Sequence, residues 1–78
     1  MNNIRRVAVN RIILDKMTFD GPVVIELVND RVVDYYKLDK ELHSTEWLGG
    51  TVKIETHDRY MIAFKDNHRI NSKERDNQ

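Results

Sequence analysis

The stretch covering residues 23–38, VVIELVNDRVVDYYKL, decides the fold of this chain. Four of its first six residues are Val or Ile, whose branched side chains favour the pleated backbone. A second β-rich block, residues 31–38, begins after only two residues, Asn29 and Asp30. Asn and Asp tolerate the positive φ that a tight hairpin turn requires. The stretch therefore predicts two antiparallel strands joined as a hairpin.

Three further apolar blocks lie outside this hairpin. Residues 6–14 are β-branched and too short and irregular for an amphipathic helix, so they predict a leading strand. Residues 51–56 alternate polar and apolar side chains, and residues 60–65 form the last apolar block. The segment between them, residues 57–59, is a predicted turn, so the two blocks predict a second hairpin.

The segments that connect these blocks differ in character. Residues 15–21 predict a loop, because Asp20-Gly21 is a turn signal and Pro22 follows it. Residues 39–50 are the most irregular part of the sequence. Within them, Ser44 or Thr45 is a good helix N-cap, and Glu46, Trp47 and Leu48 predict one helical turn that Gly49-Gly50 would end.

These elements predict an all-β or mainly β fold, a single antiparallel meander of about five strands that is open or curled and carries one short helical turn. Residues 1–65 form the predicted domain. Residues 66–78 contain only one strongly apolar side chain, Ile70, and are too polar to offset the entropy of ordering. They predict a disordered C-terminal tail.

Composition points to a small domain that needs a good core or a partner. The protein has 78 residues, no cysteine, and 13 basic and 13 acidic side chains. Disulfides and thiolate metal sites are therefore excluded, and the zero net charge does not oppose self-association. Val24, Val28, Val33 and Tyr35 exceed what a one-faced core needs, so either the sheet curls over them or a second copy covers them. We expect a homodimer, with another protein partner as a further possibility.

The segment at the start of the sequence does not have the form of a signal peptide. No apolar run approaches the ~20 residues that a membrane-spanning helix needs. We therefore expect a cytoplasmic protein without a membrane partner.

Residues that carry chemistry are present but not in catalytic or metal-binding patterns. His43, His57 and His68 do not stand at metal-ligand spacing, and no nucleophile elbow, phosphate-binding loop or dinucleotide motif is found. The sequence thus predicts no catalytic residue, no metal and no cofactor, and a protein that is not an enzyme.

Nucleic-acid binding is an alternative, because aromatic and basic residues fall on or near the predicted strands. They are Tyr35, Tyr36, Tyr60, Arg31, Lys37 and Lys53. Stacking rings within a basic stripe are what single-stranded nucleic acid requires. Asp34 and Glu55 lie among the same strands and cancel the positive field, so nucleic acid is the less favoured partner.

The segment 41–50 is the best candidate for an interaction surface. It is long, and it contains the only Trp of the protein together with two titratable groups; the candidate residues are His43, Glu46 and Trp47. The alternative interpretation of Trp47 is a hydrophobic plug over one end of the sheet. We expect a non-catalytic binding or protein-interaction module that self-associates; an accessory β subunit of a larger enzyme is another alternative.

Two segments, NDRVVDYYKL at residues 29–38 and TEWLGGTV at residues 45–52, resemble a family of short uncharacterised bacterial β-sheet proteins. In that family a DGRVVDYYPL hairpin precedes TEWLGGTI. This sequence departs from the pattern at Arg31 and at Lys37, and the first change alters the expected turn type. The family has no assigned activity, so the resemblance implies a fold and not a function. The first hairpin is also faintly similar to the β subdomain beside metal-dependent amidohydrolase barrels, whose barrel and metal ligands this sequence lacks.

Overall fold

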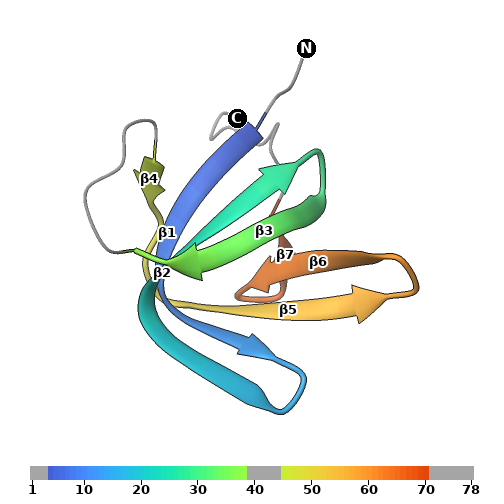
Figure 1. The fold of residues 1–78 in the computed structure, drawn as a ribbon, viewed down its shortest axis with the longest axis horizontal. Helices are drawn as coiled ribbons and strands as arrows, with labels where there is room; N and C mark the ends of the chain where they lie inside the picture. Colours follow the sequence, from blue (N-terminus) through green and yellow to red (C-terminus); the bar gives the residue numbers. More distant parts are fainter. Residues whose placement is uncertain (1–3, 39–44, 71–78) are drawn as a thin grey trace.

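The fold, seen in a computed structural model that describes residues 4–38 and 45–70, contains only β-strands within those ranges. The strands are β1 (Ile4–Leu14), β2 (Met17–Val28), β3 (Arg31–Lys37), β4 (Thr45–Trp47), β5 (Thr51–His57), β6 (Tyr60–Lys65) and β7 (His68–Arg69) (Figure 1). The predicted all-β class is confirmed.

The sheet closes on itself as a barrel. Going around it, β1 pairs with β2, β2 with β3, β3 with β6, β6 with β5, and β5 with β1 again. Strand directions cannot alternate all the way around a ring of five strands, so one neighbouring pair must be parallel. That pair is β1 and β5, and β4 also runs parallel to β1. The expected antiparallel meander is therefore corrected to a closed barrel with two parallel pairings.

The two predicted hairpins are present. β2 and β3 pair antiparallel and are joined by Asn29 and Asp30, with Asn29 at a φ of 58°. β5 and β6 pair antiparallel through Asp58 and Arg59, and Asp58 has a φ of 47°. Asn and Asp occupy the positive-φ positions, as their short polar side chains allow.

Closure produces one apolar interior. Eleven buried side chains form the core cluster: Val7, Val9, Ile12, Val23, Ile25, Leu27, Val32, Val52, Ile54, Ala63 and Ile70. They come from five of the strands and the residue after β7, so the core depends on contacts between segments far apart in sequence. Of the four residues that seemed surplus to a one-faced core, Val24 is fully buried and Tyr35 packs against the core. Curling of the sheet accounts for these two, whereas Val33 is exposed at a bulge of β3.

The predicted loop at residues 15–21 is wrong. Asp15 and Lys16 alone form the turn, with Asp15 at a φ of 54°, and β2 begins at Met17. The Asp20-Gly21 turn signal instead falls within β2, where the strand bends.

The predicted helical turn at residues 46–48 is also wrong. Thr45–Trp47 form β4, which pairs with Arg6, Val7 and Ala8 of β1. The N–H groups of Leu48 and Gly49 then both donate to the carbonyl oxygen of Ala8, at 2.9 and 3.0 Å. The open edge of β1 provides partners that a single helical turn would lack. Ser44 lies outside the described residues.

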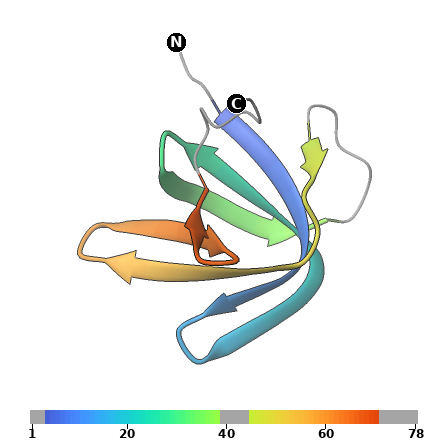
Figure 2. The ribbon, with the colours of Figure 1, turned by 180° about the vertical axis from the view of Figure 1, so that it is seen from behind.

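The barrel extends past the predicted domain end at residue 65. Asp66 and Asn67 form a positive-φ turn, and β7 pairs with the end of β6 (Figure 2). Ile70 is only 6% exposed, and its N–H donates to the carbonyl oxygen of Ala63 at 2.9 Å. Residues 66–70 thus belong to the barrel, because one buried isoleucine anchors them. Residues 71–78 lie outside the described residues.

No helix among residues 4–38 and 45–70 has the length and apolar character needed to cross a membrane.

Candidate binding cleft beside strand β2

The site begins with an irregularity in the pairing of β1 and β2. Val9 pairs with Val23, but the next pair is Arg11 with Asp20, so Asn10 opposes two residues of β2. Such bulges bend a strand and increase its twist. Asn10 therefore marks the point at which both long strands change direction.

Gly50, on the other side of β1, forms hydrogen bonds to the residues at this bulge. The N–H of Gly50 donates to Oδ1 of Asn10 at 2.7 Å, and the N–H groups of Asn10 and Arg11 donate to the carbonyl oxygen of Gly50 at 2.9 and 3.2 Å. Gly50 has a φ of 72°, a conformation that favours glycine. The parallel neighbour of β1 changes here from β4 to β5.

Gly21 completes the bend on the β2 side. A Cβ atom on Gly21 would lie 2.6 Å from the N atom of Val23 and 2.8 Å from the carbonyl oxygens of Val9 and Asn10. These neighbours are backbone atoms, which cannot rotate out of the way, so only glycine fits here. The close backbone approach explains why β2 curves at this point.

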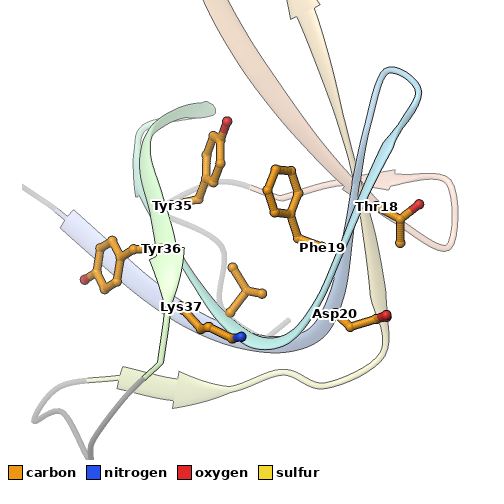
Figure 3. Close-up of a pocket in the computed structure, with 7 residues that line it drawn as sticks. Thr18, Phe19, Asp20, Tyr35, Tyr36 and Lys37 are labelled. Atoms are coloured by element: carbon orange, nitrogen blue, oxygen red, sulfur yellow. The ribbon is translucent and has the colours of Figure 1, made fainter.

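The bend divides β2 into two arms with different neighbours. The arm from Val23 to Val28 pairs with both β1 and β3, whereas the arm from Met17 to Asp20 pairs only with β1 among the described residues. A cleft of about 490 Å³ opens on the concave side. It is lined by residues of both arms and of the end of β3: Thr18, Phe19, Asp20, Val23, Tyr35, Tyr36 and Lys37 (Figure 3).

Aromatic side chains form the walls of this cleft. Phe19 of β2 and Tyr35 of β3 point toward one another, with ring centroids 6.0 Å apart and an interplanar angle of 57° (Figure 3). Val23, which is 4% exposed, belongs to the core beneath them. Tyr36 points away from the cleft, since neighbouring side chains of a strand lie on opposite faces. The cleft is thus an apolar slot between two rings.

Charge at the rim of the cleft is uneven. Asp20 Oδ1 accepts a hydrogen bond from Arg11 Nε at 2.7 Å, so its charge is already paired. Lys37 extends toward Asp20 from the opposite side of the opening (Figure 3), but no acidic partner of Lys37 exists among residues 4–38 and 45–70. Within the part of the chain that the structure describes, the ammonium of Lys37 is therefore the charge beside the aromatic slot that has no acidic partner.

A hydrogen-bonded network fixes β3 behind the cleft. Tyr36 Oη donates to Glu26 Oε2 at 2.6 Å, and Arg6 Nε donates to the same oxygen at 3.0 Å. The bond from Tyr36, joined by the bond and charge of Arg6, lowers the pKa of Glu26 although burial opposes the shift. The bond to Glu26 raises the pKa of Tyr36, and burial acts in the same direction. One side chain from each of three adjacent strands is thereby held together.

The predicted interaction residues lie elsewhere. Trp47 is on β4 and is 60% exposed, so it does not close an end of the sheet. Glu46 accepts hydrogen bonds from Arg5 Nε and Nη2 at 3.1 and 2.8 Å. His43 lies outside the described residues. Neither Glu46 nor Trp47 lines the aromatic cleft.

The tyrosines and histidines considered for nucleic-acid or metal binding are dispersed. Tyr60 stacks with His57 at 5.9 Å between centroids, and the guanidinium of Arg31 lies 4.5 Å from the centre of the Tyr60 ring. Tyr35 lines the cleft and Tyr36 faces the other side of β3, so the three tyrosines do not share one platform. Within the described ranges, no three His, Asp or Glu side chains gather as a metal site would require.

Sequence reasoning missed Phe19, because the turn signal after it placed it in a loop. The missed signal was the alternation in Met17-Thr18-Phe19-Asp20, which is apolar, polar, apolar, polar. Such alternation predicts a half-buried strand. A strand here would have placed Phe19 on the inner face next to the first hairpin.

No protein-family model, curated protein or solved structure matches this protein significantly.

Proposed function

We propose that the protein is a non-catalytic interaction module that holds an apolar side chain of a partner protein in the cleft between Phe19 and Tyr35. The observation that carries this proposal is the open aromatic slot itself. Binding sites are typically concave and mostly apolar, with a few polar groups that set orientation. The volume of about 490 Å³ falls within the usual range for such sites, roughly 300–1,000 Å³.

The charge at the rim indicates what should accompany that apolar side chain. Because Asp20 is paired with Arg11 and Lys37 has no acidic partner among the described residues, a carboxylate on the partner would be favoured beside Lys37. The preferred segment therefore carries a large apolar side chain next to an acidic group. A free terminal carboxylate and an Asp or Glu neighbour both supply that chemistry.

The composition of the cleft supports binding rather than catalysis. Its lining contains neither His nor Cys nor Ser, and the hydrogen bonds of the described residues include none from the Thr18 hydroxyl to another lining residue. Covalent or acid–base catalysis needs a nucleophile and base, or a proton donor and acceptor, within that reach. We accordingly assign no catalytic residue and no cofactor to the module.

N-acetylphenylalanine and its neutral analogue N-acetylphenylalaninamide test the proposal as a pair of probes, with binding followed by backbone amide shifts in NMR spectra. The acid should bind in the millimolar range and more tightly than the amide. Phe19→Ala should abolish the shift changes caused by both probes. Lys37→Gln should lower the affinity for the acid to that for the amide. Trp47→Ala is the matched control and should bind like the unaltered protein.

Shift changes that remain at full size in Phe19→Ala would overturn the proposal, and so would changes that map to β4 instead of β2 and β3. Equal binding of acid and amide to the unaltered protein would overturn only the role of Lys37.

Self-association is a second part of the proposed function. The zero net charge leaves no long-range repulsion between copies, and large apolar side chains such as Met17, Val33 and Trp47 are exposed. We place such a dimer in the cytoplasm. The sequence offers two alternative functions: nucleic-acid binding, and an accessory role beside a larger enzyme.

A further inference from the structure

We propose that two copies of the protein associate by pairing the free edge of β2, residues 17–20, antiparallel with the same edge of a second copy. Thr18 of one copy then lies opposite Thr18 of the other, next to a twofold axis. The inference rests on the self-association proposed above, and it names the surface responsible.

Residues 17–20 of β2 form an edge of the described sheet that has a neighbouring strand on one side only. Met17, Thr18, Phe19 and Asp20 pair with β1 on one side. On the other side β3 pairs only with residues 23–28, because β2 bends away from it at Gly21. No described strand covers the outer edge of residues 17–20. Unpaired strand edges are templates for pairing with another polypeptide.

The turn determines which backbone groups this edge offers. Asp15 and Lys16 form a two-residue turn, so Leu14 and Met17, which flank it, are a hydrogen-bonded pair of the antiparallel ladder. Bonded and non-bonded pairs alternate along such a ladder. The N–H and C=O groups of Thr18 and Asp20 therefore point away from β1, toward the open edge.

Charge selects the register between the two copies. When Thr18 faces Thr18, Lys16 of each copy lies opposite Asp20 of the other, which gives two ion pairs across the interface. Asp20 uses Oδ1 for Arg11, and its second oxygen is left for Lys16 of the other copy. A register shifted by two residues would lose both pairs. Charged residues usually protect an edge by repulsion, but here their opposite signs attract the same edge of another copy.

The apolar face of the edge is complementary in the same register. Met17 of each copy lies opposite Phe19 of the other, and both side chains are on the inner face of their strand, as their partners Leu14 and Ile12 show. Met17 is 56% exposed in the single copy. Since Phe19 is one wall of the cleft, Met17 of the second copy would extend that wall. The cleft is then completed by the partner copy.

Charge reversal tests this arrangement without touching the core. Lys16→Glu puts two carboxylates together at each of the two sites, and Asp20→Lys puts two ammonium groups together. Each variant alone should show a dimer dissociation constant raised roughly tenfold or more in sedimentation equilibrium, because two attractive cross-strand pairs become repulsive at once. An equimolar mixture restores opposite charges at both sites of each heterodimer and should therefore associate more tightly than either variant alone.

A cysteine variant locates the interface directly, because the protein has no cysteine of its own. Thr18→Cys should form a covalent dimer on mild oxidation, since Cα atoms of a bonded antiparallel pair lie about 5.5 Å apart, within the range for a disulfide. Trp47→Cys is the matched control at an exposed position on β4, and it should remain uncrosslinked.

The outcomes separate the surface from self-association as such. A concentration-independent monomer mass of the unaltered protein would overturn both proposals. A dimer that survives Lys16→Glu and Asp20→Lys unchanged, or that is crosslinked by Trp47→Cys and not by Thr18→Cys, would overturn the β2 edge while leaving self-association standing.

Discussion

Asn10 and Gly50 exchange hydrogen bonds across the point where the barrel bends: Gly50 N–H donates to Asn10 Oδ1 at 2.7 Å, and Asn10 N–H donates to Gly50 O at 2.9 Å. This pair connects the bulge between β1 and β2 to the short link that joins β4 and β5. The bend that results separates the two arms of β2 and so creates the cleft. The site therefore depends on residues that do not line it.

Replacing Asn10 tests that dependence. Asn10→Ala removes the acceptor of the Gly50 N–H and should lower the free energy of unfolding by about 1–3 kcal/mol. Asn10→Asp keeps a side-chain oxygen at the same position, so its free energy of unfolding should fall much less. Urea unfolding of both variants is the measurement. Equal losses in the two variants would show that the hydrogen bond is not what matters at this position.

Gly21→Ala should be more damaging than its small size suggests. The added Cβ would lie 2.6–2.8 Å from three backbone atoms, so the two strands must separate or the bend must change. We expect a loss of about 2 kcal/mol or more, in the range of overpacked sites. Thr56→Ala, at an exposed position of β5, should change stability by less than about 0.5 kcal/mol. Equal losses of stability of Gly21→Ala and Thr56→Ala in thermal unfolding would show that the close backbone approach at Gly21 does not require glycine.

The network of Arg6, Glu26 and Tyr36 predicts a stability that declines at both ends of the pH scale. The pKa of Glu26 is lowered in the fold, so its contribution is present above the ordinary value of 4.5 and is lost as the pH falls through the lowered pKa. The pKa of Tyr36 is raised, so its contribution is present below the ordinary value of 10.0 and is lost as the pH rises through the raised pKa.

Tyr36→Phe removes the hydroxyl that contributes to both effects. The free energy of unfolding of this variant should depend less on pH than that of the unaltered protein, below about pH 4.5 and above about pH 10. Chemical unfolding at a series of pH values measures the difference. Parallel curves for the two proteins would argue against a coupling between Glu26 and Tyr36.

Ile70 should matter to stability although it follows the last strand. It is 6% exposed within the core, so Ile70→Ala should cost about 2–5 kcal/mol and Ile70→Val about 0.5–1.5 kcal/mol. Ile4→Val, at a position that is 40% exposed, should cost less than about 0.5 kcal/mol. A negligible effect of Ile70→Ala in urea unfolding would return residues 66–70 to the tail that the sequence predicted.

Trp47→Ala should leave the fold nearly unchanged. With 60% of its surface exposed, the indole contributes little burial, and we expect a loss below about 1 kcal/mol. A loss of several kcal/mol in the same measurement would favour the plug that the sequence offered as an alternative.

Local signals were enough to predict the hairpins but not the closure. Asn29 and Asp58 stand at the turns because their side chains tolerate positive φ, and such preferences act over a few residues. The parallel pairing of β1 with β5 joins Arg11 to Thr51 and depends on contacts between distant segments. Nothing in either segment alone indicates that partner.

The cleft could not be predicted from the sequence for a related reason. Asp20-Gly21 is a common turn signal, but the same glycine also suits a tight bend within a strand. Which of the two forms depends on what lies opposite, and here that is the bulge at Asn10. Phe19 and Tyr35 become neighbours only through this bend. Trp47 was easier to notice, because it is the only Trp, yet it lies outside the cleft.

Intermolecular NOEs between N-acetylphenylalanine and the protein test directly whether the slot between Phe19 and Tyr35 is the binding site. If the slot is the site, the ring protons of the probe should give cross-peaks to the rings of Phe19 and Tyr35 and to the methyl groups of Val23. Cross-peaks confined to Trp47, or shift changes without any contact to Phe19 and Tyr35, would contradict it.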